Sequence, residues 1–251
     1  MHFTSKVSLG GAIVSAGLAA AALNPDAQGA CEPTRGGDGA CGPNGSEDWL
    51  NSGVKGNGWE PPYLDINKIA HIKLEDYYNN VGHPCRQYDQ YFKSSGQKYN
   101  IDPAILAFIA MQESSCNADA GGPTPGLMQC EPRNCQNGKD NCQYPIQDNV
   151  DCGAHVLRAA LDNAGGNAVH ALGSYNGWFT ASDGTCLNGG RGLTEDYPCS
   201  QEGKDHGVPQ NLNYLHEILN GWFQGYDMYG ADRDKDGMYN CNQNCNDGGL
   251  C

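Results

Sequence analysis

Residues 108–132, FIAMQESSCNADAGGPTPGLMQCEP, decide the fold of this chain and raise the question of its function. An apolar run ends in one acidic residue, Glu113, and a loop rich in glycine and proline follows at once. Ile105, Ile109 and Glu113 recur at steps of four and therefore lie on one face of a helix. The stretch predicts a helix in the core whose last turn carries a single carboxyl group.

Several other stretches have helical signals. Asp102 and Pro103 suit the N-cap and the first position of the helix above, and Asn167 suits the N-cap of a later one. Another helix is expected to end before Gly165-Gly166. From about Pro209, apolar residues recur at steps of three and four and predict a long last helix. Because no strand alternation of comparable strength occurs, we predict a mainly α fold in a single helical domain.

Composition restricts the class of protein. The chain has 251 residues, 13 cysteines and a formal net charge of −14. Residues 1–23 combine Lys6 with a short apolar stretch and small residues, as a secretory signal does, with an anchoring helix as the alternative. Without Lys6 the net charge is −15 (−14 − 1), which argues against nucleic acid and anionic membranes as partners. We expect a secreted, extracellular monomer with most thiols in disulfides.

Four regions are expected along the chain. Residues 1–23 are the signal peptide, and residues 24–58 are a glycine-rich flexible leader. The leader includes the only N-glycosylation sequon, Asn44-Gly45-Ser46, which is either glycosylated in a eukaryotic host or left unused. Residues 59–229 form the helical domain, in which the cysteines between positions 130 and 145 indicate a stapled loop. Residues 230–251 are a cysteine-rich acidic tail. The pairing of the cysteines cannot be deduced from their spacing.

Four short motifs, in order, resemble those of the lysozyme-like superfamily, specifically the soluble lytic transglycosylases and goose-type lysozymes. They are AMQESS around Glu113, PGLMQ at 125–129, ALGSYNGW at 171–178 and NLNYLHEIL at 211–219. The resemblance covers about residues 100–220. It implies an α+β lysozyme-like fold and cleavage of β-1,4 bonds next to N-acetylated sugars, with no cofactor.

The resemblance assigns roles to individual residues. Glu113 is expected to act as the general acid, and a carboxyl group on an apolar face has the raised pKa that this role requires. Tyr214 is expected near this carboxyl group, with a plain core role as the alternative. Substrate contacts are expected from Ser114, Gly126, Leu127, Met128, Gln129, Tyr175 and Asn176. For Ser114, a hydrogen bond to the local backbone is an equal alternative. For Tyr175 and Asn176, a Tyr-Asn pair taken alone would indicate a core residue followed by a turn residue.

The reaction depends on whether a second carboxylate takes part. Lytic transglycosylases use one glutamate and form a 1,6-anhydro sugar, whereas goose-type lysozymes add an acidic residue that positions water. Glu131 stands where the goose-type pattern has its acidic residue, and Asp119 lies in the preceding loop. Both are candidates, and a solvent-facing loop position is the alternative for Glu131. Hydrolysis by inversion requires the carboxyl groups to be roughly 6.5–9.5 Å apart.

The expected partner is a polysaccharide. The family implies peptidoglycan, which is negatively charged and would be repelled by the acidic chain. A neutral, chitin-like polymer would avoid this repulsion. A non-catalytic glycan-binding module is the alternative from another class. Asp232, Asp234 and Asp236 occupy the first positions of a calcium loop, but Gln243 stands where a glutamate is needed, so a solvated acidic turn is favoured.

Overall fold

The computed structural model describes residues 23–31, 40–136, 138, 141–180, 185–205 and 211–230. Within these ranges the chain is helical and has no strand, only three isolated β-bridges, which confirms the predicted mainly α class. The α-helices are α1 (Glu47–Leu50), α2 (Leu74–Tyr78), α3 (Asp89–Tyr99), α4 (Pro103–Ser114), α5 (Ile146–Asn163), α6 (Ala168–Tyr175), α7 (Gln201–Asp205) and α8 (Tyr214–His216). Short helical turns are η1 (Ile66–Lys68), η2 (His83–Tyr88), η3 (Pro132–Asn134), η4 (Leu187–Gly190), η5 (Tyr197–Cys199), η6 (Glu217–Gly221) and η7 (Trp222–Gln224).

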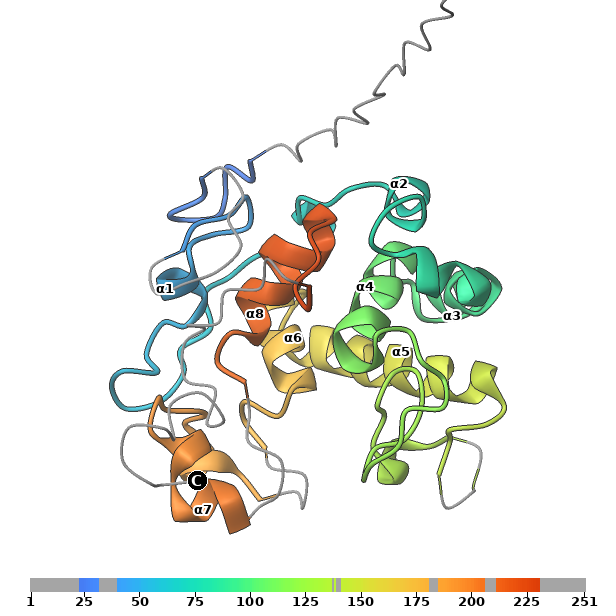
Figure 1. The fold of residues 1–251 in the computed structure, drawn as a ribbon. Coiled ribbons are helices and arrows are strands. Elements are labelled where there is room, and N and C mark those ends of the chain that lie inside the picture. The colour runs from blue at the N-terminus through green and yellow to red at the C-terminus, as the bar shows by residue number, and fades with distance from the viewer. Residues whose placement is uncertain are drawn as a thin grey trace, which may run out of the picture.

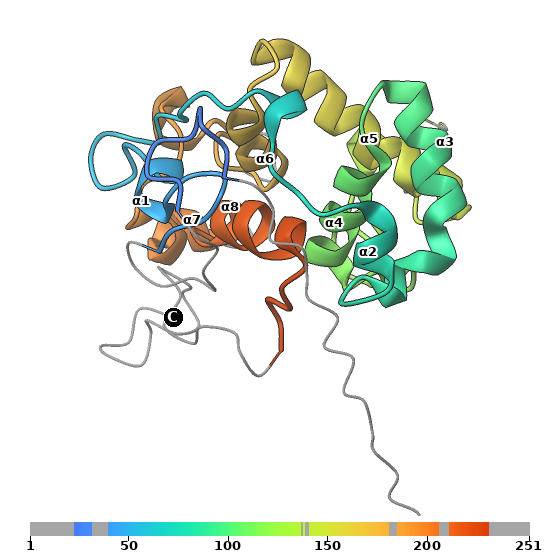
Figure 2. The same ribbon diagram turned by 90° about the horizontal axis from the view of Figure 1, so that it is seen from above.

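Helix α4 is the centre of the core. Asp102 is its N-cap and accepts a hydrogen bond from the backbone N–H of Ala104, as predicted, and Pro103 is its first residue. Every residue from Ala104 to Gln112 is buried, so the helix is enclosed on all sides, beyond the single buried face that its periodicity indicates. Both views show α4 between α2 and α3 on one side and α8 on the other (Figures 1 and 2).

Disulfide bonds attach the loops to the helices. Cys85–Cys116 ties η2 to the residues that follow α4, and Cys130–Cys152 ties the loop after α4 to α5. Cys135–Cys142 closes the cysteine-rich loop, so the predicted staple is present. Among the described residues, Cys31–Cys41 is the fourth pair and Cys186 is a free, exposed thiol.

The last helix is less regular than its apolar periodicity predicts. Over the described residues it consists of α8, a π-helical turn η6 and the short turn η7. The change of winding ends at Gly221, whose backbone lies at φ −106° and ψ −86°, outside the helical region. A π-turn of this kind places one extra residue in the helix and changes which side chains face α4.

The segment predicted as a flexible leader is packed against this last helix where the structure describes it. The side-chain oxygen of Asn44 accepts from the backbone N–H of Ala70 at 2.8 Å, and its nitrogen donates to the carbonyl of Leu219 at 2.7 Å. Asn220 accepts from the Asn44 backbone N–H at 3.0 Å. Asn44 is 0% exposed. Glycine content alone predicts flexibility, whereas these bonds and the buried Leu50 join the segment to the domain.

Three expectations fall wholly or almost wholly outside the described residues: the signal peptide over 1–23, the tail over 230–251, and the calcium candidates Asp232, Asp234 and Asp236. In the part of the chain that the structure covers, no helix combines the length and the apolar character that crossing a bilayer requires.

Candidate active site

Glu113 lies in the last turn of α4, where the helix reaches the surface. Its side chain is partly exposed, and Tyr214, at the start of α8, donates a hydrogen bond of 2.7 Å to its Oε1. Desolvation by the surrounding atoms raises the pKa of Glu113 to about 7, and the hydrogen bond from Tyr214 lowers it in part. The carboxyl group therefore holds a proton near neutral pH and still meets solvent, as a proton donor must.

Tyr175, at the end of α6, is the second phenol beside this carboxyl group. Burial raises its pKa well above the ordinary value, and the charge of Glu113 raises it further. Its hydroxyl donates to the carbonyl of Met128 at 2.8 Å. The phenol thus links α6 to the loop after α4.

The backbone turns sharply directly after Ser114, the last residue of α4. Ser115 and Cys116 both lie in the left-handed region, at φ +54° and +55°, which is unfavourable for residues with a side chain. The Cys85–Cys116 disulfide fixes the second of them to η2. This turn ends the helix at Ser114, the residue after Glu113, and directs the chain into the Gly/Pro loop.

Ser114 fastens that loop to the helix. Its hydroxyl lies 2.7 Å from the carbonyl oxygen of Leu127 and 3.0 Å from that of Ala110, and it accepts from the backbone N–H of Asn117 at 3.1 Å. The alternative of bonding to local backbone is thus what the structure has. Ser114 brings the carbonyl of Leu127 to the residue next to Glu113.

The Gly126-Leu127-Met128 segment is buried, with Leu127 at 1% and Met128 at 0% exposure. Gly126 has φ +105°, and a Cβ atom at this position would lie 2.6 Å from Nδ2 of Asn149. Asn149, fully buried on α5, accepts from the backbone N–H of Met128 at 2.7 Å and donates to the carbonyl of Pro125 at 3.1 Å. The glycine is therefore required by the packing of Asn149, a residue that the sequence motifs did not identify.

Gln129 is held by its own loop. Its Nε2 donates to the carbonyl of Gly126 at 2.9 Å, and its Oε1 accepts from the hydroxyl of Thr124 at 3.3 Å. Its backbone lies at φ +46°, so it also occupies the left-handed region. Asn176 similarly accepts from the indole N–H of Trp178 at 3.1 Å, which leaves its amide nitrogen as the polar group available to a ligand.

The two candidate second carboxylates have partners of their own. Glu131 forms an ion pair with Arg133 and is partly buried, and this burial raises its pKa although the nearby guanidinium opposes the rise. Asp119 is exposed and accepts a hydrogen bond from the hydroxyl of Tyr144. The contacts of these carboxyl groups are thus with the cysteine-rich loop and with η3 rather than with Glu113.

A buried polar group lies behind Glu113. Gln112 contacts Glu217 at 2.9 Å and Trp222 at 2.6 Å, both on the segment that begins with Tyr214. The only sequence signal for these residues is a glutamine and a glutamate at positions that the helical period places in the core, and such a signal does not reveal that they meet.

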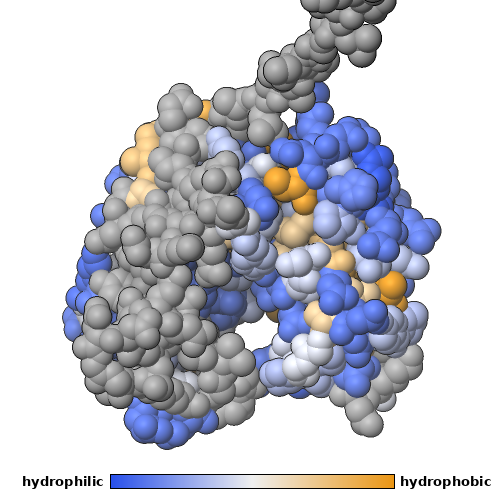
Figure 3. Space-filling view, viewed as in Figure 1, coloured by the Kyte–Doolittle hydropathy of each residue, from blue (hydrophilic) through white to orange (hydrophobic). Residues whose placement is uncertain are grey.

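The space-filling view shows an open gap through the face that carries these elements (Figure 3). It lies where Figure 1 places the segment that follows α6 opposite the loops that follow α4.

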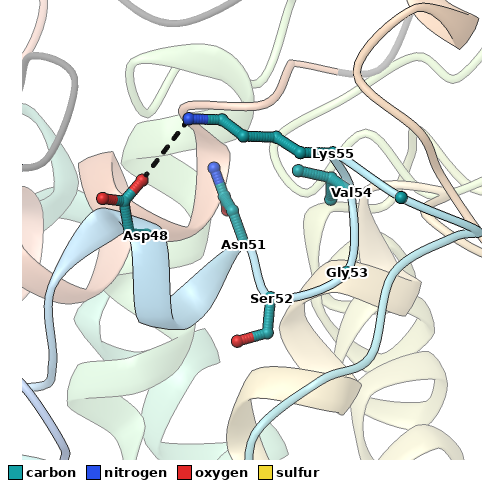
Figure 4. A pocket seen from close by; sticks show the side chains of 7 residues that line it. Asp48, Asn51, Ser52, Gly53, Val54 and Lys55 are labelled. Atoms are coloured by element: carbon teal, nitrogen blue, oxygen red, sulfur yellow. Dashed lines mark ion pairs between the residues drawn. The ribbon is translucent and has the colours of Figure 1, made fainter.

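A separate cavity of about 320 Å³ is formed by α1 and the turn after it (Figure 4). Asp48 and Lys55, 3.8 Å apart, form an exposed ion pair at its edge, with Asn51 between them. Because this cavity includes none of the residues around Glu113, it is not the site described above.

Residues 90–183 match the family model of the transglycosylase SLT domain, a stretch that includes α4, its loop and α6 and ends before Tyr214. An inactive mutant of the lytic transglycosylase Slt from Pseudomonas aeruginosa shares 18% identity over 52% of this chain and 23% of its own, with a TM-score of 0.34. The 70 kDa soluble lytic transglycosylase Slt70 from Escherichia coli shares 18% identity over 58% of this chain and 26% of its own, with a TM-score of 0.36.

The chain thus spans about a quarter of the length of these two proteins. Three of the four sequence motifs, AMQESS, PGLMQ and ALGSYNGW, lie inside the matched stretch, and the fourth lies beyond its end. Residues 90–183 are thus similar to the transglycosylase SLT domain, and the predicted resemblance to the soluble lytic transglycosylases is confirmed.

Proposed function

We propose that the protein is an exported lytic transglycosylase that cleaves the β-1,4 bonds of peptidoglycan with Glu113 as its single acid and base. The observation that carries the proposal is the state of Glu113: partly exposed at the end of a buried helix, with a pKa of about 7 because its carboxyl group is desolvated. The match of residues 90–183 to the transglycosylase SLT domain supports the reaction type.

In the proposed reaction Glu113 first donates a proton and then accepts one. Protonated Glu113 donates to the glycosidic oxygen as the bond from that oxygen to C1 breaks. The carboxylate that remains accepts the proton of the C6 hydroxyl, whose oxygen bonds to C1 and forms the 1,6-anhydro ring. Water is not consumed, and Glu113 ends protonated, ready for the next bond. Tyr214 donates to the carboxyl group and so keeps one of its oxygens oriented during both transfers.

The contacts of the other two candidate carboxylates also favour a mechanism in which Glu113 is the single catalytic carboxyl group. Glu131 is engaged with Arg133, and Asp119 with Tyr144. A carboxylate that positions water for inversion must hold that water across the sugar from the acid, roughly 6.5–9.5 Å away, whereas the contacts of these two carboxylates are with other side chains of the protein. We therefore propose 1,6-anhydro products rather than hydrolysis.

Peptidoglycan is the proposed substrate because of the family match, although the chain and the polymer are both negatively charged. Screening limits this repulsion to about 8–10 Å at physiological salt, so it slows encounter without preventing binding. The polar group that we assign to an N-acetylated sugar is the amide nitrogen of Asn176, whose side-chain oxygen accepts from Trp178.

The test is digestion of purified peptidoglycan and of chitin by wild type and by Glu113→Gln, with mass spectrometry of the product ends. We expect anhydro-ended fragments from peptidoglycan and a loss of about 10²–10⁴-fold in turnover for Glu113→Gln, the range for removal of a general acid. Reducing ends alone would contradict transglycosylation, and release from chitin alone would contradict the substrate.

A glycan-binding module without activity is the remaining alternative. Wild type that binds peptidoglycan and releases no fragment at any pH from 4 to 9 would favour it. Binding requires no proton donor, so a module of this kind would bind equally well as wild type and as Glu113→Gln.

A further inference from the structure

Behind the Glu113–Tyr214 pair lies a second, fully buried link between α4 and the last helix. Gln112 is 8% exposed, Glu217 4% and Trp222 2%. Nε2 of Gln112 donates to Oε2 of Glu217 at 2.9 Å, and the indole N–H of Trp222 donates to Oε1 of Gln112 at 2.6 Å. Asn211 also donates to Oε2 of Glu217, at 3.2 Å.

The partners fix which way the amide of Gln112 points. An indole nitrogen can only donate, so Trp222 requires the amide oxygen of Gln112. The amide nitrogen then faces Glu217, whose carboxylate oxygen can accept. In addition, the hydroxyl of Tyr229 donates to the backbone carbonyl of Gln112. Both the side chain and the backbone of Gln112 are thus held by the C-terminal segment.

The two links run side by side. Gln112 and Glu113 are neighbours in the last turn of α4, and their partners Glu217 and Tyr214 are three residues apart on the opposite segment. Apolar side chains tolerate small sliding of one helix along another, but a shift here would leave buried amide and carboxylate groups without partners. The buried link therefore sets the position of α4 relative to Tyr214 more sharply than the apolar contacts do.

We propose that Gln112 and Glu217 are positioning residues for the catalytic pair: they hold the last turn of α4 and the start of the last helix in the register that puts the hydroxyl of Tyr214 on Oε1 of Glu113. The inference rests on the proposed function, in which that pair carries the proton. Trp222 belongs to the same arrangement because it orients the amide of Gln112.

A double-mutant cycle between the two links tests the proposal. The substitution Gln112→Met keeps an unbranched side chain and removes both of its hydrogen bonds, and Tyr214→Phe removes the phenol that Glu113 accepts from. The readouts are kcat and KM on peptidoglycan and the pKa of Glu113, measured by NMR titration of ¹³C-labelled carboxyl groups. A role in general stability alone would change neither the pKa nor the coupling.

We expect Gln112→Met to lower kcat about 10-fold with little change in KM, which is within the coupling seen in shared hydrogen-bond networks. It should also raise the pKa of Glu113, as Tyr214→Phe does, because the bond from Tyr214 lowers this pKa. The double variant should be nearly the same as Tyr214→Phe. Glu217→Gln, which keeps an acceptor for Gln112, should retain most activity. The exposed Gln87, changed to Met, is the matched control and should behave as wild type.

An unchanged pKa of Glu113 in Gln112→Met, or effects that multiply in the double variant, would overturn the proposal. If Gln112→Met does not fold, Trp222→Phe removes the donor to Gln112, together with part of a buried ring, and carries the same expectations for the pKa of Glu113. The titration needs no turnover: if wild type cleaves no glycan, the proposed function fails, and the coupling between the two links is still decided by the pKa values.

Discussion

Tyr214 donates a hydrogen bond of 2.7 Å to Oε1 of Glu113, although 101 positions separate the two residues in the chain. The bond joins the end of a buried helix to the start of the last one. It lowers the pKa of Glu113, which desolvation raises to about 7. The position of this carboxyl group between buried and exposed surroundings is the feature from which the proposed chemistry follows.

Glu113 makes the stability of the protein depend on pH. Its pKa rises from 4.5 in the unfolded chain to about 7 in the fold, so the folded state retains a proton that the unfolded state releases. The associated stability is fully present below pH 4.5 and is lost as pH rises to 7, by up to about 3 kcal/mol at 1.36 kcal/mol per pH unit. We expect Glu113→Gln to be more stable than wild type at pH 8 and little different at pH 4.5.

Urea unfolding at the two pH values measures this difference. Gln87→Met replaces an exposed side chain that does not titrate, so it serves as the control and should have the same pH dependence as wild type. A free-energy difference between Glu113→Gln and wild type that is equal at pH 4.5 and pH 8 would contradict the raised pKa.

Gly126 and Gly122 form a matched pair within one loop. Their backbones lie at φ +105° and +106°, but a Cβ at Gly126 would strike Asn149, whereas nothing lies within 4 Å of one at Gly122. Both alanine variants incur the same left-handed strain. Only Gly126→Ala displaces a fully buried amide, so we expect it to be less stable by roughly 1–3 kcal/mol more than Gly122→Ala.

Thermal unfolding of the two variants, together with turnover on peptidoglycan, tests this expectation. Equal losses of stability would mean that Asn149 does not require the glycine. In that case the substrate contact expected at Gly126 would gain support, and Gly126→Ala would then lower turnover without a matching loss of stability.

Asn44 connects the N-terminal segment to the last helix, and we expect Asn44→Ala to reduce stability by roughly 2–4 kcal/mol, because several buried groups lose their partners. The exposed Asn67, changed to Ala, is the control and should cost less than about 0.5 kcal/mol. Urea unfolding measures both.

Because the side chain of Asn44 is 0% exposed and its nitrogen is bonded to backbone carbonyls, folded protein from a eukaryotic secretory host should carry no glycan there. Glycan on the folded protein, seen in the intact mass, would contradict this packing.

The other two acidic candidates can be separated from Glu113 by substitution. We expect Glu131→Gln and Asp119→Asn each to retain turnover on peptidoglycan within about threefold of wild type, since a positioned second carboxylate is needed only for hydrolysis. The products should remain anhydro-ended. A loss as large as that of Glu113→Gln in either variant would assign a second acid and favour the goose-type reaction.

The sequence predicted the parts of the fold that depend on local signals. Asp102 and Asn167 are the N-caps that their residue types indicated, because a cap is decided within three residues of chain. The placement of Glu113 at the end of a buried helix also follows from periodicity. The hydrogen bond from Tyr214 was expected only from the resemblance, since no local pattern relates residues so far apart in the chain.

The remainder depends on contacts between distant segments. The glycines of residues 24–58 suggested a flexible leader, yet Asn44 bonds to Leu219, and nothing near Asn44 in the sequence indicates that partner. Likewise, the apolar period of the last helix could not indicate the π-turn at Glu217–Gly221, which is adjacent to the Gln112 network. Residue types in the sequence indicated which side chains are candidates for a role, but the contacts of each side chain depend on segments that are distant in the chain.

The central claim is that Glu113 is the proton donor and is protonated because its carboxyl group is desolvated. The most direct test compares the NMR titration of the Glu113 carboxyl group in wild type with the pH dependence of kcat/KM on peptidoglycan. We predict a carboxyl midpoint near 7 and a kcat/KM that falls as pH rises through that same value, because only the protonated acid can act. A midpoint near the ordinary value of 4.5, or a kcat/KM that does not fall where Glu113 titrates, would contradict the account.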